Sequence, residues 1–386
     1  MREKALKMHE KYRGKIEVIS KVPVETSEDL SLAYSPGVAE PCKEIEKDEN
    51  NIYKYTAKGN LVAVVTDGSA VLGLGNIGPK AALPVMEGKA ILFKEFGDVD
   101  AFPICLDTQD TEEIIKAIKL MAPTFGGINL EDITSPRCVE IENRLKAELD
   151  IPIFHDDQHG TAIVTLAALI NSLKIIKKDK SDIKVVVSGV GAAGSAIIRT
   201  LHTYGVKHIV AVDRHGMLNK DHYDQYDFVK QEMFGYIESG DGSLADAMKN
   251  ADVFVGVSVA GLVSKEMVES MNNEPIILAM ANPVPEIMPE IAKEAGAVIV
   301  GTGRSDYPNQ VNNVSAFPGI FRGVFDAKAH TITGEMMVEA AYAIASFIPD
   351  NELNVENIIP SALNKEVSKL VAQRVKDKAI EQGVTR

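Results

Sequence analysis

Short, almost wholly apolar runs alternate along this chain with longer segments whose apolar residues recur at helical spacing. Such runs, rich in valine and isoleucine, are typical of strands buried on both faces of a parallel sheet. The runs predicted as strands are 61–68, 127–130, 151–155, 183–187, 208–212, 252–257, 276–280 and 297–300. The segments predicted as helices are 84–96, 111–121, 138–149, 162–173 and 192–203, followed by a helical tail from residue 334. This alternation indicates an α/β protein built on parallel sheets.

The 386 residues are enough for about two domains, each with its own core. A predicted helix of small and apolar residues, 162–173, leads into a glycine-rich strand–turn–helix unit, so we place the domain boundary near residue 160. The predicted fold is a smaller α/β N-terminal domain, residues 1–160, followed by a Rossmann-type doubly wound parallel sheet with C-terminal helices, residues 161–386. We expect the active site in the cleft between the two domains.

The turn after the run at 183–187 carries three glycines in G-x-G-x-x-G spacing: Gly189, Gly191 and Gly194. In a dinucleotide-binding fold the first glycine permits a tight turn and the second lets the backbone approach a pyrophosphate. The third lets helix and strand pack closely, and the helix N-terminus offers free N–H groups to the phosphates. A purely structural turn is the alternative. A second glycine-rich loop, 69–79, is interpreted as a substrate-side turn, because no clear strand–helix unit frames it in the sequence.

Asp213 ends the next predicted strand, about 20 residues after the third glycine of the motif. A carboxylate at this position accepts hydrogen bonds from the ribose hydroxyls of the adenosine. It would repel the 2′-phosphate of NADP, whereas the neighbouring Arg214 could accommodate that phosphate. NAD is therefore the predicted cofactor, and NADP is the alternative.

Two consecutive predicted strands, 127–130 and 151–155, each end in an acidic pair: Glu131-Asp132 and Asp156-Asp157. A helix between the strands would make them parallel, so both pairs would lie at the same edge of the sheet. Four carboxylates there would repel one another unless a cation lay between them. All-oxygen ligands suit Mg²⁺ or Mn²⁺ and argue against zinc. For either pair alone, capping of the following helix is the alternative interpretation.

Further polar residues stand where they could do chemistry, and each has a plainer alternative. Lys89 lies in an apolar stretch that would lower its pKa toward the range of a general base, although most lysines are simply solvated. Tyr34 stands beside a Ser-Pro-Gly turn, where a packing role is favoured from the sequence alone. Asn282, Asn312 and Asn313 carry amides suited to a carboxylate or a nicotinamide, or to a turn.

The composition limits the possible partners. The net charge of −14, with no basic stripe to offset it, argues against nucleic-acid and anionic-membrane partners, and an anionic substrate would require local positive charge or a metal ion. Cys42, Cys105 and Cys138 are too widely spaced to indicate a disulfide framework or a zinc site. The charged N-terminus lacks a signal-peptide core, and no apolar run reaches the length of a membrane span. We therefore expect a cytoplasmic protein.

Taken together and in this order, the motifs resemble those of malic enzymes, in the short form found in prokaryotes. The resemblance rests on AYSPGVAEPC, DGSAVLGLGNIGP, EGKAILFKEFGDVDAFPICLD, NLEDI, FHDDQHGTA, SGVGAAG, ANPVPE and NNVSAFPG, which are spread over nearly the whole chain. It implies oxidative decarboxylation of (S)-malate to pyruvate and CO₂ with reduction of NAD(P)⁺. It also implies a Mg²⁺ or Mn²⁺ ion and suggests a homodimer.

The resemblance implies three catalytic residues. Tyr34 of AYSPG takes the place of the family's proton donor, and Lys89 of EGKA takes that of its general base. Asp156 would be the carboxylate that orients the lysine and tunes its pKa. The positions that match the family's metal ligands are Glu131, Asp132 and Asp157.

The resemblance also implies residues that bind the cofactor and the substrate. Asn282 and Asn313 match the asparagines that hold the substrate and the nicotinamide end, and Asn312 is a weaker match. The implied cofactor-binding residues are Gly189, Gly191, Ala192, Ala193, Gly194, Asp213 and Asn282. The implied substrate-binding residues are Lys94, Asn282, Asn312 and Asn313.

One motif departs from the larger members of the family, which carry an arginine on the substrate carboxylate two residues after an Asp-Gly pair. Here the Asp-Gly pair at 67–68 is followed by serine and alanine. We expect Lys94 or Arg137, together with the metal, to supply the missing positive charge.

Two other functions would use the same dinucleotide site. A 2-hydroxy-acid dehydrogenase that does not decarboxylate is one, and the paired acidic strand ends argue against it, because plain hydride transfer needs no metal. A protein that senses NAD without turnover is the other. The presence of Lys89 and of both acidic pairs argues against it.

Overall fold

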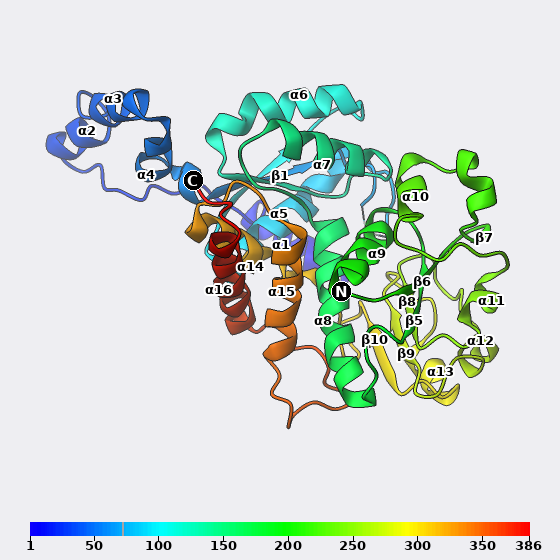
Figure 1. Cartoon of the computed structure of the whole chain (residues 1–386). Helices are drawn as coiled ribbons and strands as arrows, with labels where there is room; N and C mark the ends of the chain where they lie inside the picture. Colours follow the sequence, from blue (N-terminus) through cyan, green and yellow to red (C-terminus); the bar gives the residue numbers. More distant parts are fainter. Residues whose placement is uncertain (72) are drawn as a thin grey trace.

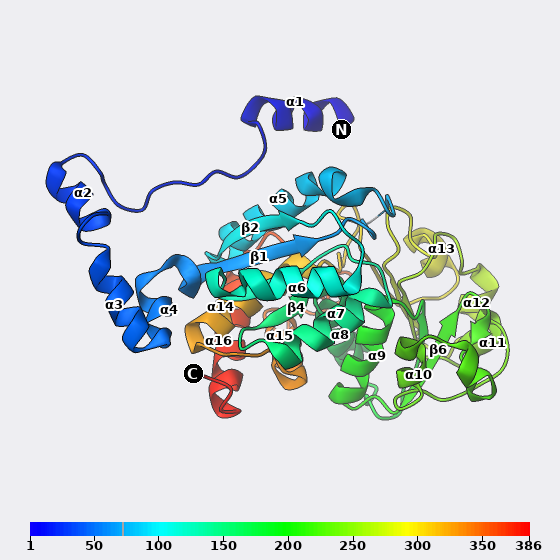
Figure 2. The same ribbon diagram turned by 90° about the horizontal axis from the view of Figure 1, so that it is seen from above.

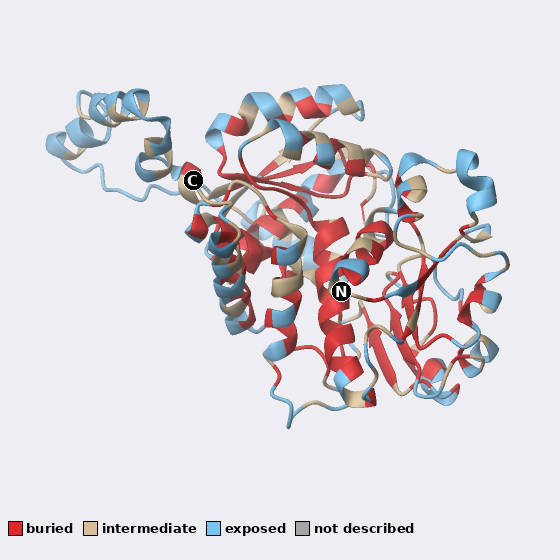
Figure 3. Cartoon of the chain, viewed as in Figure 1, coloured by how far each residue is buried: buried red, intermediate tan, exposed pale blue. Residues whose placement is uncertain are grey.

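The computed structural model describes residues 1–71 and 73–386, so Leu72 of the second glycine-rich loop lies outside the described residues. The described residues form a four-stranded sheet and a six-stranded sheet, and the long helix α8 (Asp156–Ile176) leads from the first to the second (Figure 1). Buried residues are concentrated in both sheets and in α8 (Figure 3). The predicted α/β fold class is confirmed.

The first sheet is parallel throughout and has the strand order β2-β1-β3-β4. Its strands are β1 (Leu61–Thr66), β2 (Asp100–Cys105), β3 (Gly127–Leu130) and β4 (Ile153–His155). The helices between them are α5 (Gly78–Gly97), α6 (Thr111–Met121) and α7 (Arg137–Glu148). The sequence did not predict β2, which contains Pro103 and is only partly buried. A proline is tolerated there because β2 is an edge strand.

The second sheet has the order β10-β9-β8-β5-β6-β7, in which β7 alone runs antiparallel to its neighbour. Its strands are β5 (Lys184–Ser188), β6 (His208–Asp213), β7 (Gly216–Met217), β8 (Val253–Gly256), β9 (Ile276–Ala279) and β10 (Ile299–Thr302). The chain extends the sheet from β5 to β6 and then returns to place β8 on the other side of β5. This reversal creates the crevice at the carboxyl ends of β5 and β8 where dinucleotides bind in Rossmann-type sheets.

Helix α8 is the central core helix. It is long and apolar enough to cross a membrane by length and composition, but 78% of its most apolar window is buried inside the protein. Helix α9 (Ala192–Tyr204) packs against it after the glycine motif. The expected domain boundary near residue 160 falls in the first turns of α8.

The C-terminal helices pack on both halves of the molecule. They are α14 (Phe317–Ala327), α15 (Gly334–Ser346) and α16 (Lys365–Glu381). Helix α15 packs against α8, whereas α14 and α16 return to α5 of the first sheet. Phe93 of α5 lies 4.7 Å from Phe317 and 5.2 Å from Phe321, measured between ring centroids. The C-terminal segment that the sequence assigned to the second domain therefore also completes the core of the first.

The N-terminal segment projects from the rest of the molecule as an extended arm, which we define as residues 1–56 (Figures 1 and 2). Its helices are α1 (Arg2–Tyr12), α2 (Ser27–Ala33), α3 (Ala39–Lys47), η1 (Glu49–Asn51) and α4 (Ile52–Tyr55). Every residue of these helices is exposed or half-buried. The arm touches the body near Lys15, whose backbone N–H donates to Glu87 of α5 at 2.9 Å.

Short elements complete the fold and connect the strands. They are η2 (Ala57–Asn60), η3 (Ala122–Thr124), η4 (Lys220–Gln225), α10 (Phe228–Met233), α11 (Leu244–Met248), α12 (Lys265–Glu269), α13 (Pro289–Glu294) and η5 (Asn313–Ser315).

Candidate functional site

A buried lysine and two carboxylates meet at the carboxyl edge of the first sheet. The Nζ atom of Lys89, on α5, lies 2.6 Å from Oδ2 of Asp156 and 3.0 Å from Oε1 of Glu131. The side chains of all three residues are buried. The ammonium group also lies 4.4 Å from the centroid of the Phe317 ring, so a C-terminal helix closes one side of this site.

The charge of Lys89 is strongly stabilised in this arrangement. Burial alone would lower the pKa of Lys89, but the carboxylates of Asp156 and Glu131 outweigh it and raise the pKa above its ordinary value. The lowered pKa expected from the apolar sequence around Lys89 is therefore wrong. The sequence could not show that two carboxylates from other elements face the ammonium group.

Three carboxylates converge beside the lysine. Ligand oxygens of Glu131, Asp132 and Asp157 all lie within 4.8 Å of one another. The convergence follows from the sheet, because β3 and β4 are neighbours with Leu130 paired to His155, and the acidic pairs come directly after them. The backbone N–H of Asp132 donates to Oδ2 of Asp157 at 2.8 Å, which holds the two strand ends together.

The donor set of this cluster fits a hard divalent cation. It consists of carboxylate oxygens alone, as Mg²⁺ and Mn²⁺ prefer. Burial raises the pKa of Glu131 despite the nearby Lys89, and the carboxylates of Asp157 and Asp156 raise it further. A cation among these groups would relieve their mutual repulsion.

A cavity of about 490 Å³ lies next to the carboxylates and is lined by the predicted asparagines. Asn282 follows β9, and Asn312 and Asn313 lie at η5, so two other segments of the chain meet Asp157 there. Asn313 donates from Nδ2 to Oδ2 of Asp156. Asn312 uses its side-chain oxygen locally, accepting from the backbone N–H of Val314 at 3.0 Å.

The second glycine-rich loop reaches the same cavity through Ala70 and Gly73. The loop therefore lies beside the carboxylate cluster, and its substrate-side role stays a prediction. The reason given from the sequence was wrong, since β1 and α5 do frame this loop as a strand–loop–helix unit.

A larger cavity, of about 680 Å³, adjoins the first and follows the glycine motif of β5 and α9. The two cavities share Ser135 and Ser258 among their lining residues. Gly191 faces open space, with no described atom within 4 Å of a Cβ built on it, so the backbone is accessible to a pyrophosphate. At Gly194 a Cβ would lie 1.7 Å from the carbonyl oxygen of Gly189, so close strand–helix packing requires glycine.

Six of the seven predicted cofactor residues line one of the two cavities, and Gly194 lines neither. Gly189, Gly191 and Asp213 line the larger one, while Ala192, Ala193 and Asn282 line the smaller one. The cavities thus form a continuous path from the end of β6, through the glycine turn, to the carboxylate cluster. Asp213, predicted to bind the adenosine, and Asn282, predicted to bind the nicotinamide end, thus lie in adjoining cavities.

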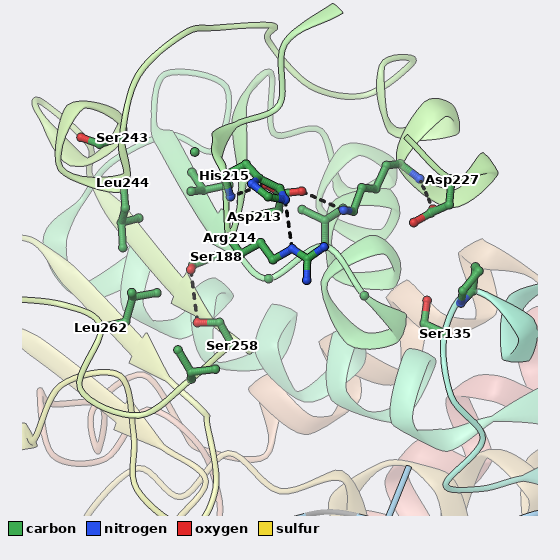
Figure 4. Close-up of a pocket in the computed structure, with 18 residues that line it drawn as sticks. Ser135, Ser188, Asp213, Arg214, His215, Asp227, Ser243, Leu244, Ser258 and Leu262 are labelled. Carbon is green, nitrogen blue, oxygen red and sulfur yellow. Dashed lines mark hydrogen bonds and ion pairs between the residues drawn. The ribbon is translucent and has the colours of Figure 1, made fainter. Parts of the chain in front are cut away.

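Asp213 is engaged by the protein itself, which the sequence did not indicate. Its Oδ2 atom lies 2.7 Å from Nζ of Lys230 on α10, and its Oδ1 accepts from the backbone N–H of His215 at 2.8 Å. Figure 4 shows Asp213, Arg214 and His215 together on one wall of the larger cavity. The carboxylate's charge is therefore paired, and the sequence-based reason for preferring NAD over NADP is weakened.

Lys94 lies at the opposite edge of the first sheet. Its Nζ atom forms ion pairs with Asp98 at 2.6 Å and with Asp100 at 3.0 Å. Asp100 begins β2 and pairs with the first residue of β1, so Lys94 sits at the amino ends of strands whose carboxyl ends form the site. The expectation that Lys94 binds the substrate is therefore wrong, because helix α5 points it away from the cavity.

Arg137, the other candidate cation, does lie beside the substrate-side loop. Its guanidinium is 2.7 Å from Oδ2 of the buried Asp67 and donates to Oγ of Ser69 at 3.0 Å. Arg137 thus reaches the loop at residues 67–69 from α7. Part of its charge is balanced by Asp67.

Tyr34 is not brought to the cavity within this chain. It ends α2 on the N-terminal arm, and its side chain is 68% exposed. Figures 1 and 2 agree that α2 projects well away from both sheets.

Glu142, a fully buried carboxylate of α7 that was not predicted from the sequence, holds the start of α8. Glu142 accepts hydrogen bonds from the backbone N–H of His155 at 3.2 Å, from Gln158 at 3.1 Å and from His159 at 2.8 Å. Although burial opposes it, His159 and Lys146 hold the pKa of Glu142 well below its ordinary range. A signal was available, because Glu142 stands at the same face as the apolar stripe of 138–149.

Comparisons with known proteins agree over the whole chain. The sequence model of the malic enzyme N-terminal domain matches residues 13–146, and that of the malic enzyme NAD binding domain matches residues 158–380. The bifunctional malic/malolactic enzyme of Bacillus subtilis is 59% identical, covering 100% of this chain and 95% of that protein. The NAD-dependent malic enzyme of Geobacillus stearothermophilus is 56% identical, covering 97% of this chain and 78% of that protein. The crystal structure of malic enzyme from Pyrococcus horikoshii superposes with a TM-score of 0.94 at 50% identity, covering 100% of this chain and 92% of that one.

Proposed function

This chain belongs to the malic enzyme family, and from that premise we propose how it oxidises (S)-malate with NAD(P)⁺ and decarboxylates it to pyruvate and CO₂. One observation carries the assignment of the site. The buried Lys89–Asp156 pair and the Glu131–Asp132–Asp157 cluster lie together, next to a cavity that continues to the glycine motif. We expect a cytoplasmic enzyme that acts on a free small molecule.

We assign the three clustered carboxylates to a Mg²⁺ or Mn²⁺ ion, on the strength of their all-oxygen donor set. When bound, the cation would polarise the oxygens of the substrate, and the dinucleotide would accept the hydride from C2. Asn282 lies where it would orient the nicotinamide end, and Asn313 holds the Asp156 carboxylate from the same side.

Lys89 is the proposed general base for the C2 hydroxyl of malate. Asp156 faces its Nζ atom at 2.6 Å and fixes its position, so the ammonium group and the carboxylate form one proton-handling pair. The positive charge of the assigned metal ion would counter the effect of the carboxylates that raise the pKa of Lys89. Arg137 is the proposed positive group for the second carboxylate of the substrate.

Tyr34 is the proposed proton donor to C3, acting in a homodimer. The arm that carries it exposes a series of large apolar side chains, among them Val18 at 86%, Ile19 at 72% and Leu32 at 70% exposed. A run of this kind is expected to be covered by another protein surface. We propose that the arm of each copy lies against the body of the other, which would bring Tyr34 to the partner's cavity.

The test follows reduced cofactor by its near-ultraviolet absorbance, with L-malate, Mn²⁺ and either NAD⁺ or NADP⁺, coupled to a pyruvate assay. We expect reduced cofactor and pyruvate in a one-to-one ratio, and loss of both when a chelator is added. Reduction without pyruvate would indicate a dehydrogenase that does not decarboxylate. Cofactor binding without reduction would indicate a sensing protein and would overturn the proposal.

A further inference from the structure

The carboxylate at the adenosine end of the larger cavity is paired with a cation, unlike the carboxylate of a site selective for NAD. In such a site a free carboxylate at the end of the second strand accepts the ribose hydroxyls and repels a 2′-phosphate. Here the Asp213 side chain is 8% exposed, and Lys230 neutralises it at 2.7 Å. Although burial opposes it, Lys230 and the His215 backbone hold the pKa of Asp213 below its ordinary value, so the pair is a stable ion pair at neutral pH.

Two further groups with nitrogen donors face the same wall. Arg214 and His215 follow Asp213 directly and line the cavity with it (Figure 4). Arg214 donates from Nε to Nε2 of the His215 ring at 3.0 Å. Within the described part of the chain, Arg214 forms no ion pair with a carboxylate, so its guanidinium keeps an uncompensated charge at the cavity.

Lys230 is held in place by its own helix. Asp227 caps α10 by accepting from the backbone N–H of Lys230 at 3.1 Å, and the ring of Tyr226 lies 5.8 Å from its Nζ atom. Only 22% of the Lys230 side chain is exposed. The lysine is therefore ordered before any ligand arrives, and its remaining N–H groups can serve a second acceptor beside Asp213.

The charged side chains that line this end of the cavity are Asp213, Arg214, Asp227 and Lys230. Asp213 and Lys230 form an ion pair, and Asp227 accepts from the backbone N–H of Lys230 at the start of α10. The cation of this end that has no carboxylate partner among the described residues is the guanidinium of Arg214, whose planar donors suit a phosphate.

We infer that Lys230 and Arg214 form a binding site for the 2′-phosphate of NADP⁺, so that the enzyme uses NADP⁺ at least as well as NAD⁺. This inference rests on the proposed dinucleotide site, whose glycine turn lines the same cavity through Gly189 and Gly191. With the pyrophosphate at that turn, the 2′ position of the adenosine ribose falls at the end of β6, where these cations lie.

The experiment uses two probes that differ only in the 2′-phosphate. Isothermal titration calorimetry compares adenosine 2′,5′-bisphosphate with adenosine 5′-monophosphate on the full-length protein near physiological ionic strength. We expect the bisphosphate to bind about tenfold more tightly or better, since charge-assisted hydrogen bonds to phosphate are strong. Lys230→Gln and Arg214→Gln should each reduce this ratio by about fivefold or more, and Lys230→Arg should preserve it.

Lys220→Gln is the matched control. It removes the same charge from η4, in the same connection between β7 and β8, at an exposed position outside the cavity lining. This variant should leave the ratio unchanged, which separates a local site from a general effect of charge.

Equal affinity of wild-type protein for the two probes would overturn the inference. So would an equal loss of affinity for both probes in Lys230→Gln, because that is the effect of a lysine that only supports the fold of α10. The proposed function is tested separately. If malate is oxidised with NAD⁺ alone, the proposed function holds and the inference fails. If the bisphosphate binds tightly but malate is not oxidised with either cofactor, the inference holds and the proposed function fails.

Discussion

The positive charge of Lys89 compensates for the burial of Asp156 and Glu131, so the proposed general base also stabilises the fold. The ammonium group lies 2.6 and 3.0 Å from the two buried carboxylates, and its attraction offsets the free energy lost when they are removed from water. Without this partner, the two buried charges would strongly destabilise the fold. Removing the lysine should therefore change two measurable properties: the rate of malate oxidation and the stabilisation of the protein by a metal ion.

We expect Lys89→Ala to lower kcat for malate oxidation by about 10²–10⁴-fold, the usual contribution of a positioned general base. The same variant leaves its carboxylates without a cation, so Mn²⁺ should raise its melting temperature more than it raises that of the wild type. Steady-state kinetics and thermal melts with and without Mn²⁺ measure the two effects.

Lys94→Ala is the control for this prediction, because Lys94 is on the same helix but pairs with Asp98 and Asp100 at the other edge of the sheet. Its kinetic constants should stay near those of the wild type. Near-normal kcat in Lys89→Ala, or an equal effect of the two substitutions, would contradict the assignment of Lys89.

The residues of the carboxylate cluster could be predicted from the sequence. The charge partners of Lys89 and Asp213 could not. Glu131, Asp132 and Asp157 each follow a strand, and parallel strands bring their carboxyl ends to one edge. The pKa of Lys89 and the pairing of Asp213 depend on partners from other elements. Lys230, for example, reaches Asp213 from a helix whose position no local pattern specifies.

At the scale of elements, Glu142 connects α7 to the start of α8 and so fixes the segment that carries Asp156 and Asp157. We expect Glu142→Gln to weaken Mn²⁺ binding by about 10-fold or more, as loss of a residue that supports metal ligands does. Titration of Mn²⁺ followed by electron paramagnetic resonance measures the affinity directly.

Glu140→Gln is the matched control on the same helix. The Glu140 side chain is 45% exposed and pairs only loosely with Arg144, at 3.4 Å. Its Mn²⁺ affinity should be unchanged. If the two variants bound Mn²⁺ equally well, Glu142 would have no role in positioning the ligands.

Asp252, just before β8, also connects separate segments of the chain through hydrogen bonds. It accepts from Nζ of Lys178 at 2.7 Å, from the backbone N–H of Lys184 at 2.8 Å and from Asn272 at 3.0 Å. Although burial opposes it, these donors lower the pKa of Asp252 below the ordinary value of 3.8. A lowered folded-state pKa stabilises the protein above pH 3.8, and this contribution disappears as the pH falls through the folded value.

We therefore expect Asp252→Asn to reduce the free energy of unfolding by about 1–3 kcal/mol between pH 5 and pH 8. The difference from the wild type should narrow below pH 3.8. Urea unfolding at several pH values measures it. Asp350→Asn, which removes an 83% exposed carboxylate from its pair with Lys174, should change the free energy little at any pH.

Strands with apolar, β-branched sequences were predictable, whereas β2 and the two-residue β7 were not. β2 is an edge strand with a proline, and only one of its six residues is buried, so it lacks the continuous apolar run of its neighbours. The sequence also could not show where the C-terminal helices pack. An apolar helix face shows that it will be covered but not by which sheet, and α14 is covered by α5 from the other half of the chain.

At the scale of the whole molecule, the position of Tyr34 determines how many copies make one complete site. Tyr34 ends α2 and is 68% exposed, and α2 projects away from both sheets (Figure 2). If the arm serves a partner, as proposed, then Tyr34 and Lys89 of one working site belong to different chains. Two inactive variants should then restore each other's activity.

We expect Tyr34→Phe and Lys89→Ala each to form dimers with little activity. When the two are co-expressed in equal amounts, about a quarter of the wild-type activity should return. Half of randomly paired dimers are mixed, and one of the two sites in each mixed dimer then has both an intact tyrosine and an intact lysine. Native mass spectrometry of the two variants, made distinguishable by different affinity tags, gives the fraction of mixed dimers. If mixed dimers form without any return of activity, Tyr34 acts within its own chain, and the arm must fold back onto the body during catalysis.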